Sequence, residues 1–370
     1  MSQQENNRAS ISRVKSLVDQ GLWFPDSEYS VNNDNEKVKL SDITSYLLTR
    51  ARRSSAALND LQSPSLQDKC RGAMIGAAVG DALGTTIEFT TPGSFEPVTD
   101  ITGGGPFQLQ AGEWTDDSSM MLCLAHSILR TQRFTLTDQI ELYLKWRNEG
   151  AFSVTATCFD IGNTVSQALN NYVDDGNPEA GPTDRFSAGN GSLMRLAPVP
   201  IFYNRDFAAA VEQSGLSSKT THGAEEAVDA CRYFGGLIWG ALNGASKEEL
   251  LSGLYDPLGG YWQANPLCDS IRDLTTSQQY KTKSASEVRG SGYVMHSLEA
   301  VLWAFSTTDN FAEGLLKAVN LGEDADTTGC IYGQLAGAYY GEPRIPYRWI
   351  NKISHRETFY LFADDLVMTG

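Results

Sequence analysis

The sequence has little of what zinc proteins and membrane proteins use. Its 370 residues include only four histidines and six cysteines, and neither type shows a zinc-site spacing such as CxxC or HExxH. No apolar run approaches the roughly 18 residues that span a membrane, and residues 1–16 lack the hydrophobic region of a signal peptide. These absences predict a cytoplasmic protein whose cysteines are buried reduced thiols rather than disulfides.

Basic residues are also scarce relative to acidic ones. The chain has 29 lysines and arginines against 45 aspartates and glutamates, a net charge of -16. Such a balance argues against a general affinity for nucleic acid or for an anionic membrane surface. Residues 1–65 carry eight basic and eight acidic residues, so the negative excess belongs to residues 66–370. We therefore treat 1–65 as an N-terminal extension and 66–370 as the main domain.

Strand-like alternation is nearly absent, whereas apolar residues recur at helical spacing along most of the chain, so we predict an all-α fold. Gly72, Gly76 and Gly80 fall four residues apart in the first helix of the main domain, which predicts a smooth face for close approach by another helix. The predicted helices cover residues 11–20 and 40–61 in the extension, and 66–84, 120–131, 137–147, 154–172, 223–243 and 311–321 in the domain.

Two short segments concentrate oxygen ligands. Thr115, Asp116 and Asp117 follow Gly112-Glu113-Trp114, and Asp324, Asp326 and Thr327 follow Gly322-Glu323. Carboxylates and hydroxyls suit Mg²⁺, Mn²⁺ or Ca²⁺ rather than zinc. Each segment stands where a helix is predicted to begin, so helix capping is the structural alternative for either one alone. If the two segments meet in space, their carboxylates would repel one another unless cations neutralise them, and a binuclear metal site becomes the better explanation.

Other polar residues stand out for their surroundings. Asp81 and Glu88 are acids where the pattern predicts burial, and buried acids are usually paired or functional. The loop 187–195 places glycines on both sides of Asn190 and ends at Arg195, so it can bind an anion or simply cap a helix. His222 stands at a helix entrance, where capping is again the alternative. The loop Gly103–Pro106 lacks the Lys-Ser/Thr of a phosphate-binding P-loop.

Taken in order, these segments resemble the ADP-ribosylglycohydrolase family, of the dinitrogenase-reductase-activating glycohydrolase type. The resemblance spans residues 70 to about 340 and does not extend to residues 1–65. It rests on these blocks: Arg71-Gly72 to Gly80-Asp81-Ala82-Leu83-Gly84 with Glu88, Gly112-Glu113-Trp114-Thr115-Asp116-Asp117, Gly189-Asn190-Gly191-Ser192-Leu193-Met194-Arg195, Thr221-His222, Ser291-Gly292-Tyr293-Val294 and Asp324-Ala325-Asp326-Thr327.

The resemblance implies an orthogonal helical bundle that holds two Mg²⁺ ions, with Mn²⁺ as a possible substitute. It implies that Glu88 is a catalytic carboxylate beside the metals; on chemical grounds either Glu88 or Asp117 can accept the proton of a metal-bound water. The metal ligands that it implies are Thr115, Asp116, Asp117, Asp324, Asp326 and Thr327. The residues that it places at the ADP-ribose are Asn190, Gly191, Ser192, Met194, Arg195 and His222, with Tyr293 near the ligand.

The expected activity is Mg²⁺-dependent hydrolysis of the bond between ADP-ribose and a protein side chain. Arginine is the favoured side chain, because the Gly-x-Trp-Thr-Asp-Asp form resembles the arginine-reversing members; serine and other linkages, or a small conjugate, remain open. The alternative is an immunity protein that blocks an ADP-ribosyltransferase toxin through residues 1–65, where Trp23 and Phe24 form an apolar knot in polar surroundings. That knot fits either a partner-docking arm or a clasp on the main domain.

Overall fold

The computed structural model describes residues 29–31, 37–39 and 63–370. It divides the chain into two units, Met1–Pro64 and Ser65–Gly370. In the first unit, strands β1 (Tyr29–Val31) and β2 (Lys37–Lys39) pair antiparallel, with Ser30 opposite Val38. The helices predicted at 11–20 and 40–61 and the Trp23-Phe24 knot lie outside the described residues.

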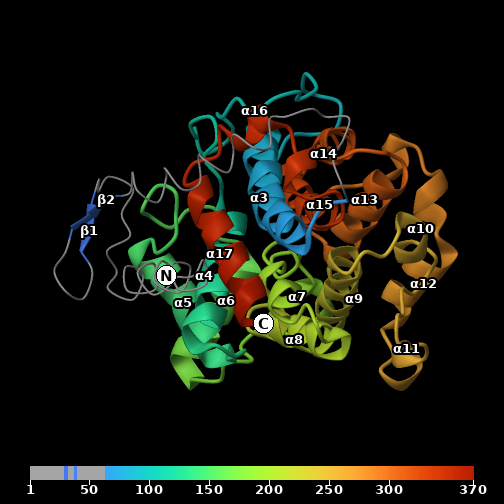
Figure 1. The fold of residues 1–370 in the computed structure, drawn as a ribbon, viewed down its shortest axis with the longest axis horizontal. Coiled ribbons are helices and arrows are strands. Elements are labelled where there is room, and N and C mark those ends of the chain that lie inside the picture. The colour runs from blue at the N-terminus through green and yellow to red at the C-terminus, as the bar shows by residue number, and fades with distance from the viewer. Residues whose placement is uncertain (1–28, 32–36, 40–62) are drawn as a thin grey trace. The chain divides into compact units, whose positions relative to one another are not determined.

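The second unit is built from helices, and the all-α prediction is confirmed (Figure 1). Only isolated β-bridges occur within residues 63–370, and no helix there is long and apolar enough to cross a membrane. The α-helices are α3 (Leu66–Gly84), α4 (Asp116–Thr131), α5 (Leu136–Glu149), α6 (Asn163–Asp175), α7 (Pro198–Phe202), α8 (Phe207–Lys219), α9 (Glu225–Leu242), α10 (Lys247–Leu250), α11 (Tyr261–Ala264), α12 (Asp269–Ser277), α13 (Val294–Ser306), α14 (Phe311–Val319), α15 (Ala325–Tyr340), α16 (Tyr347–Ile350) and α17 (Arg356–Thr369). Short 3-10 helices lie at Thr85–Ile87, Arg185–Ser187, Gln279–Thr282, Ala285–Glu287 and Glu342–Arg344.

One predicted helix differs from the structure. The helix expected over 154–172 begins only at Asn163, and residues 154–162 form turns. Ala156 and Asp160 have φ values of 56° and 58°, in the left-handed region that interrupts a right-handed helix. The loop that replaces the helix start matters, because Asp160 belongs to the site described below.

Helices α3 and α15 pack against each other through glycines at the centre of the second unit (Figure 1). A β-carbon built on Gly72 would lie 2.2 Å from the carbonyl oxygen of Gly337, and one on Gly80 would lie 2.0 Å from that of Gly329. Gly76 meets Gly333 in the same way, at 2.5 Å. No side chain fits at these distances, so the predicted glycine face is confirmed. Because the helices run antiparallel, the last turn of α3 meets the first turn of α15.

Candidate active site and metal centre

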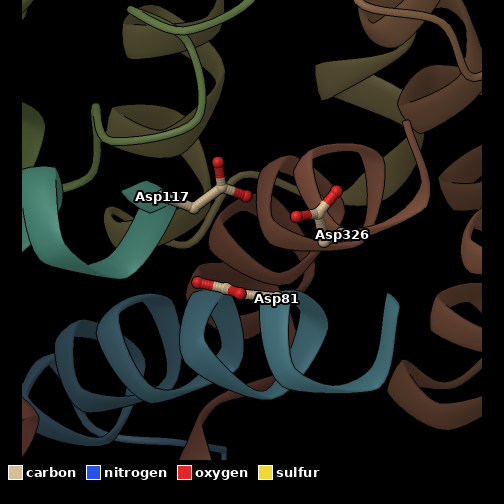
Figure 2. Close-up of side chains that lie close together, drawn as sticks. All are labelled: Asp81, Asp117 and Asp326. Atoms are coloured by element: carbon tan, nitrogen blue, oxygen red, sulfur yellow. The ribbon is translucent and has the colours of Figure 1, made fainter. Parts of the chain in front are cut away.

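Three aspartates from three helices converge where α3 ends and where α4 and α15 begin (Figure 2). One carboxylate oxygen each from Asp81 on α3, Asp117 on α4 and Asp326 on α15 lies within 4.8 Å of the others. All three residues are buried. The two acidic segments that the sequence separates by some 200 residues therefore meet in space, as the metal hypothesis requires.

A second group shares one of these aspartates. Oxygens of Glu88, Asp160 and Asp326 also lie within 4.8 Å of one another, so Asp326 belongs to both sets. Two oxygen clusters with a common carboxylate have the composition expected of a two-ion site for hard cations. Asp160 was missed by the sequence analysis because it lies in a loop without a motif. Asp81 was noted as a buried acid but was not predicted to be a ligand.

Asp81 fixes the geometry by capping α4 from a neighbouring helix. Its Oδ1 accepts hydrogen bonds from the amide and hydroxyl of Thr115 at 2.8 and 3.0 Å, and its Oδ2 accepts from the amide and hydroxyl of Ser118 at 3.1 and 2.7 Å. Thr115 is the N-cap residue of α4, as predicted, but its own side chain makes no capping bond. Asp81 thus satisfies two of the four free amides of the helix start and fixes the turn that carries Asp116 and Asp117.

The remaining predicted ligands lie at the same junction. The hydroxyl of Thr327 donates to Asp117 Oδ1 at 3.2 Å, and that of Thr115 lies 3.3 Å from Asp326 Oδ2. The side-chain amide of Asn190 donates to Asp324 Oδ2 at 2.6 Å. One oxygen each of Asp117, Asp326 and Asp324 is therefore oriented by a neighbour, as is common in protein metal sites.

The acids of this cluster are destabilised as anions. Burial, followed by repulsion from neighbouring carboxylates, raises the pKa values of Asp116, Asp117 and Asp326 well above the usual range. The same causes raise the pKa of Asp160 to about 8. Burial raises the pKa of Asp81 to about 6, even though its four hydrogen bonds act in the opposite direction.

Several oxygens in the cluster lack any protein partner. Glu88 Oε2, Asp117 Oδ2 and Asp326 Oδ1 are buried without a hydrogen bond. Such orphaned acceptors are costly, and bound divalent cations would both pair with them and lower the pKa values of the carboxylates. The donor set therefore fits metal ions, and its all-oxygen chemistry suits hard cations such as Mg²⁺, Mn²⁺ or Ca²⁺ rather than zinc.

A cavity of about 780 Å³ opens beside the cluster. It contains no lysine or arginine among its lining residues, although five acidic residues line it. The residues predicted for the site that line this cavity are Glu88, Asp116, Asn190, Gly191, Met194, His222, Asp324 and Thr327. The structure thus brings most of the predicted site together.

Three residues predicted to bind substrate do not line this cavity. Ser192 is buried and its hydroxyl is 2.8 Å from that of Ser218. Arg195 is 0% exposed, and its guanidinium donates to neighbouring carbonyl and hydroxyl oxygens instead of facing the cavity. Tyr293 lines a second cavity, with Phe186 and Arg272, and its hydroxyl donates to Glu226 at 2.6 Å. These three residues support the cavity wall or lie beyond it.

Comparison with known proteins gives this geometry a family. Residues 62–370 match the model of the family described as ADP-ribosylglycohydrolase. The chain belongs to the ADP-ribosylglycohydrolase family. The predicted family and the predicted enzyme class, a hydrolase of the glycosidase type, are both confirmed.

Individual members of the family are similar over most of the chain. It is 40% identical over 302 residues to "ADP-ribosylarginine hydrolase Tri1" of Pseudomonas putida, covering 81% of this chain and 78% of that relative. It is 32% identical to "ADP-ribosyl-[dinitrogen reductase] glycohydrolase" of Rhodospirillum rubrum, covering 79% and 92%. A solved structure titled "ADP-ribosylglycohydrolase-related protein complex" aligns with a TM-score of 0.72 at 40% identity, covering 82% of this chain and 99% of that one.

Proposed function

We propose that this ADP-ribosylglycohydrolase is a Mg²⁺-dependent hydrolase that cleaves the N-glycosidic bond between ADP-ribose and modified arginine side chains of proteins. The observation that carries the proposal is the convergence of Asp81, Asp117 and Asp326 with Glu88 and Asp160 beside the cavity. The names of two relatives at 40% identity, both called ADP-ribosylarginine hydrolase, favour this linkage.

The metal ligands that we propose combine the predicted set with two acids that the structure adds. Asp326 would serve both ions, because it belongs to both oxygen clusters. Thr115, Asp116, Asp117, Asp324 and Thr327 stay in the proposed set, and Asp160 joins it; Asp81 would act mainly by orienting Thr115 and Ser118. When bound, Mg²⁺ would orient the ribose diol and lower the pKa of a coordinated water.

We propose that Glu88 accepts the proton of the attacking water. The residue is 4% exposed and lines the cavity, and its Oε2 has no hydrogen-bond partner in the protein. Burial and the charges of Asp326 and Asp160 raise its pKa in the metal-free protein. Bound cations would lower that pKa, and the Glu88 carboxylate could then accept the proton of the attacking water as oxygen adds to the ribose carbon. The departing guanidine nitrogen takes up a proton, so one water is consumed; Asp117 is the alternative acceptor.

The anionic diphosphate meets a cavity without basic side chains, so its binding would depend on cations and on hydrogen-bond donors. Gly191 and Asn190 line the cavity, and His222 lies beside them. A β-carbon built on Gly189 or on Gly191 would lie 3.2 Å from His222 Nε2. Glycine at these positions therefore allows the imidazole to lie against the loop, where we propose that it contacts ADP-ribose.

Phe89 offers an exposed aromatic ring at the cavity, which suits the planar guanidinium of an arginine. Phe89 follows Glu88 directly, lines the cavity and is 67% exposed. Its φ of 59° is unusual for a bulky residue, and its amide is held by the carbonyl of Glu323 at 2.6 Å. An exposed ring held beside carboxylates is a good contact for the guanidinium of an arginine, because cation–π attraction contributes about 0.5–2 kcal/mol.

The direct test is release of ADP-ribose from an arginine-ADP-ribosylated protein, with Mg²⁺ and with excess chelator. We expect release that requires the metal. A serine-linked substrate run in parallel tests the linkage. Equal release with chelator would contradict the metal assignment, and release from the serine-linked substrate alone would contradict the arginine assignment.

A further inference from the structure

Arg195 is a buried cation held without a carboxylate partner among the residues that the structure describes. Its guanidinium donates to the carbonyl oxygen of Gly191 at 3.1 Å and to the hydroxyls of Thr221 and Thr220 at 2.7 and 3.2 Å. It also lies over the ring of Tyr143, 4.5 Å from the ring centroid. The guanidinium thus binds the back of the loop that carries Asn190, whose front faces the cavity.

Thr221 contacts both Arg195 and His222 through its hydroxyl. The hydroxyl of Thr221 lies 2.9 Å from His222 Nδ1, and both residues are buried. Arginine can only donate hydrogen bonds, so the Thr221 oxygen is the acceptor toward Arg195. The single hydroxyl hydrogen of Thr221 then needs an acceptor, and His222 Nδ1 is its only other hydrogen-bond partner among the described residues.

This arrangement decides which imidazole nitrogen carries the proton. If Nδ1 were protonated, it would donate to Thr221, and the hydroxyl hydrogen of Thr221 would be buried without an acceptor. An unmade hydrogen bond of this kind is costly. With the proton on Nε2 instead, Thr221 donates to Nδ1, and the Nε2–H is left to donate to solvent or to a ligand in the cavity that His222 lines. Burial and the charge of Arg195 lower the pKa of His222 to about 3, which agrees with a neutral ring.

We propose that Arg195 and Thr221 are positioning residues that hold His222 as the neutral Nε2–H tautomer, so that it donates a hydrogen bond to an acceptor oxygen of the substrate beside Gly189 and Gly191. In the described part of the chain no protein acceptor is found opposite Nε2, and His222 lines the cavity. The statement about the substrate rests on the proposed function, whereas the statement about the tautomer does not.

The tautomer can be measured directly in the ligand-free protein. Long-range nitrogen–proton correlation spectra distinguish Nδ1–H, Nε2–H and doubly protonated imidazoles. The chain has only four histidines, so a His222→Gln variant assigns the signal by its loss. We expect the Nε2–H pattern at neutral pH. An Nδ1–H pattern or a doubly protonated ring would overturn the proposal, whether or not the protein proves to be a hydrolase.

Substitutions at Thr221 test the positioning role against a matched control. In Thr221→Val, Nδ1 loses its donor; we expect a mixture of tautomers and a roughly threefold to tenfold weaker affinity for ADP-ribose in the presence of Mg²⁺, measured by calorimetry. Thr221→Ser should restore both values. Thr220→Val removes a neighbouring Arg195 acceptor without touching His222, and we expect it to leave the tautomer unchanged.

Two outcomes of this series would contradict the positioning role. One is an unchanged His222 spectrum in Thr221→Val, which would mean that the hydroxyl does not select the tautomer. The other is an equal change in Thr220→Val, which would mean that the effect arises from general loosening around Arg195. Failure of Thr221→Val to fold would leave the wild-type spectrum as the deciding measurement.

Discussion

At one end of the α3–α15 pair, Arg71 forms an ion pair with Asp364 and lies over the ring of Tyr360. At the other end, Asp81 and Asp326 face each other, and the structure gives neither an ion pair with a basic residue among those that it describes. The glycine contacts are equally close at both ends, with β-carbon distances of 2.2 Å at Gly72 and 2.4 Å at Gly84. Packing is therefore the same along the pair, and the difference between the ends is one of charge.

The comparison indicates where the protein needs an external ion. Buried carboxylates without counter-charges are strongly unfavourable, typically by several kcal/mol for each unpaired ion. The fold supplies a counter-charge at the Arg71 end, where Asp364 pairs with the guanidinium. Among the residues that the structure describes, no such counter-charge is paired with the acids at the Asp81 end, where a lysine or arginine side chain would fill the space available to a metal cation. The unpaired acids are thus best explained as a site kept open for metal.

The largest expected effect comes from removing the carboxylate that belongs to both oxygen clusters. Asp326→Asn keeps the shape of the side chain but weakens the attraction for two ions. We expect turnover of an arginine-ADP-ribosylated protein to fall by about 1,000-fold. The free energy of unfolding measured without metal should stay the same or rise, because a repelled buried charge is removed.

The matched control is Asp364→Asn at the opposite end of the helix pair, which should leave kcat within about twofold. Calorimetric titration of Mg²⁺ into both variants gives a second measure, with binding lost in Asp326→Asn alone. If Asp326→Asn turned over substrate at the wild-type rate, Asp326 could not be a ligand that both metal ions require.

Asp364→Asn should instead act on stability. The side chains of Arg71 and Asp364 are 11% and 19% exposed, and Arg71 Nε donates to Asp364 Oδ1 at 2.7 Å. Breaking a pair this poorly hydrated leaves a cation without its partner, and we expect a loss of about 2 kcal/mol in urea denaturation. The double variant Arg71→Met/Asp364→Leu should recover part of that loss. A stability unchanged by Asp364→Asn would mean that the two ends do not differ as described.

The acids at the Asp81 end also predict that the stability of the metal-free protein depends on pH, and that bound metal abolishes this dependence. Asp81 and Asp160 have folded-state pKa values raised to about 6 and about 8, above the value of about 4 for an unfolded aspartate. Between about pH 4 and pH 8 the metal-free folded protein therefore binds more protons than the unfolded chain, and its stability falls as the pH rises through this range. His222, with its lowered pKa, opposes this trend only below about pH 6.5.

Lowering the pH from 8 to 6.5 should then stabilise the chelated protein, by up to about 1.4 kcal/mol per pH unit for each proton taken up. With excess Mg²⁺ the gain should disappear, because the cations keep the carboxylates ionised. Denaturant midpoints at both pH values, with chelator and with Mg²⁺, make the comparison. The same gain in both conditions would place its origin outside the metal cluster.

The sequence predicted what local patterns encode. The fold class followed from helical periodicity, and the close helix pair followed from glycines at positions 72, 76 and 80. The two acidic segments were found because each holds its oxygens within a few residues. The sequence alone could not establish that the two segments meet in space, because their meeting depends on how α3, α4 and α15 pack.

The missed features are those that depend on tertiary structure. Asp160 has no motif, and the helix predicted over 154–172 would have hidden it; the left-handed φ values that interrupt that helix occur at ordinary residues. Arg195 was predicted to face an anion because it follows a glycine loop. Its actual partners, Thr220 and Thr221, come some 25 residues later, and no local pattern indicates on which side of the loop the guanidinium lies.

The smallest effect is expected from deleting the N-terminal extension, which lies outside the comparison of the two ends. Every proposed metal ligand and catalytic residue lies between Asp81 and Thr327, and α3 starts with its own capping box, in which Ser65 and Asp68 exchange hydrogen bonds. We therefore expect a protein of residues 63–370 to fold and to hydrolyse its substrate within about twofold of the full chain, because it keeps every proposed site residue. Parallel kcat/KM measurements on both chains test this. A large loss would mean that the extension completes the site, whereas unchanged turnover combined with loss of binding to an ADP-ribosyltransferase would favour the docking arm proposed for residues 1–65.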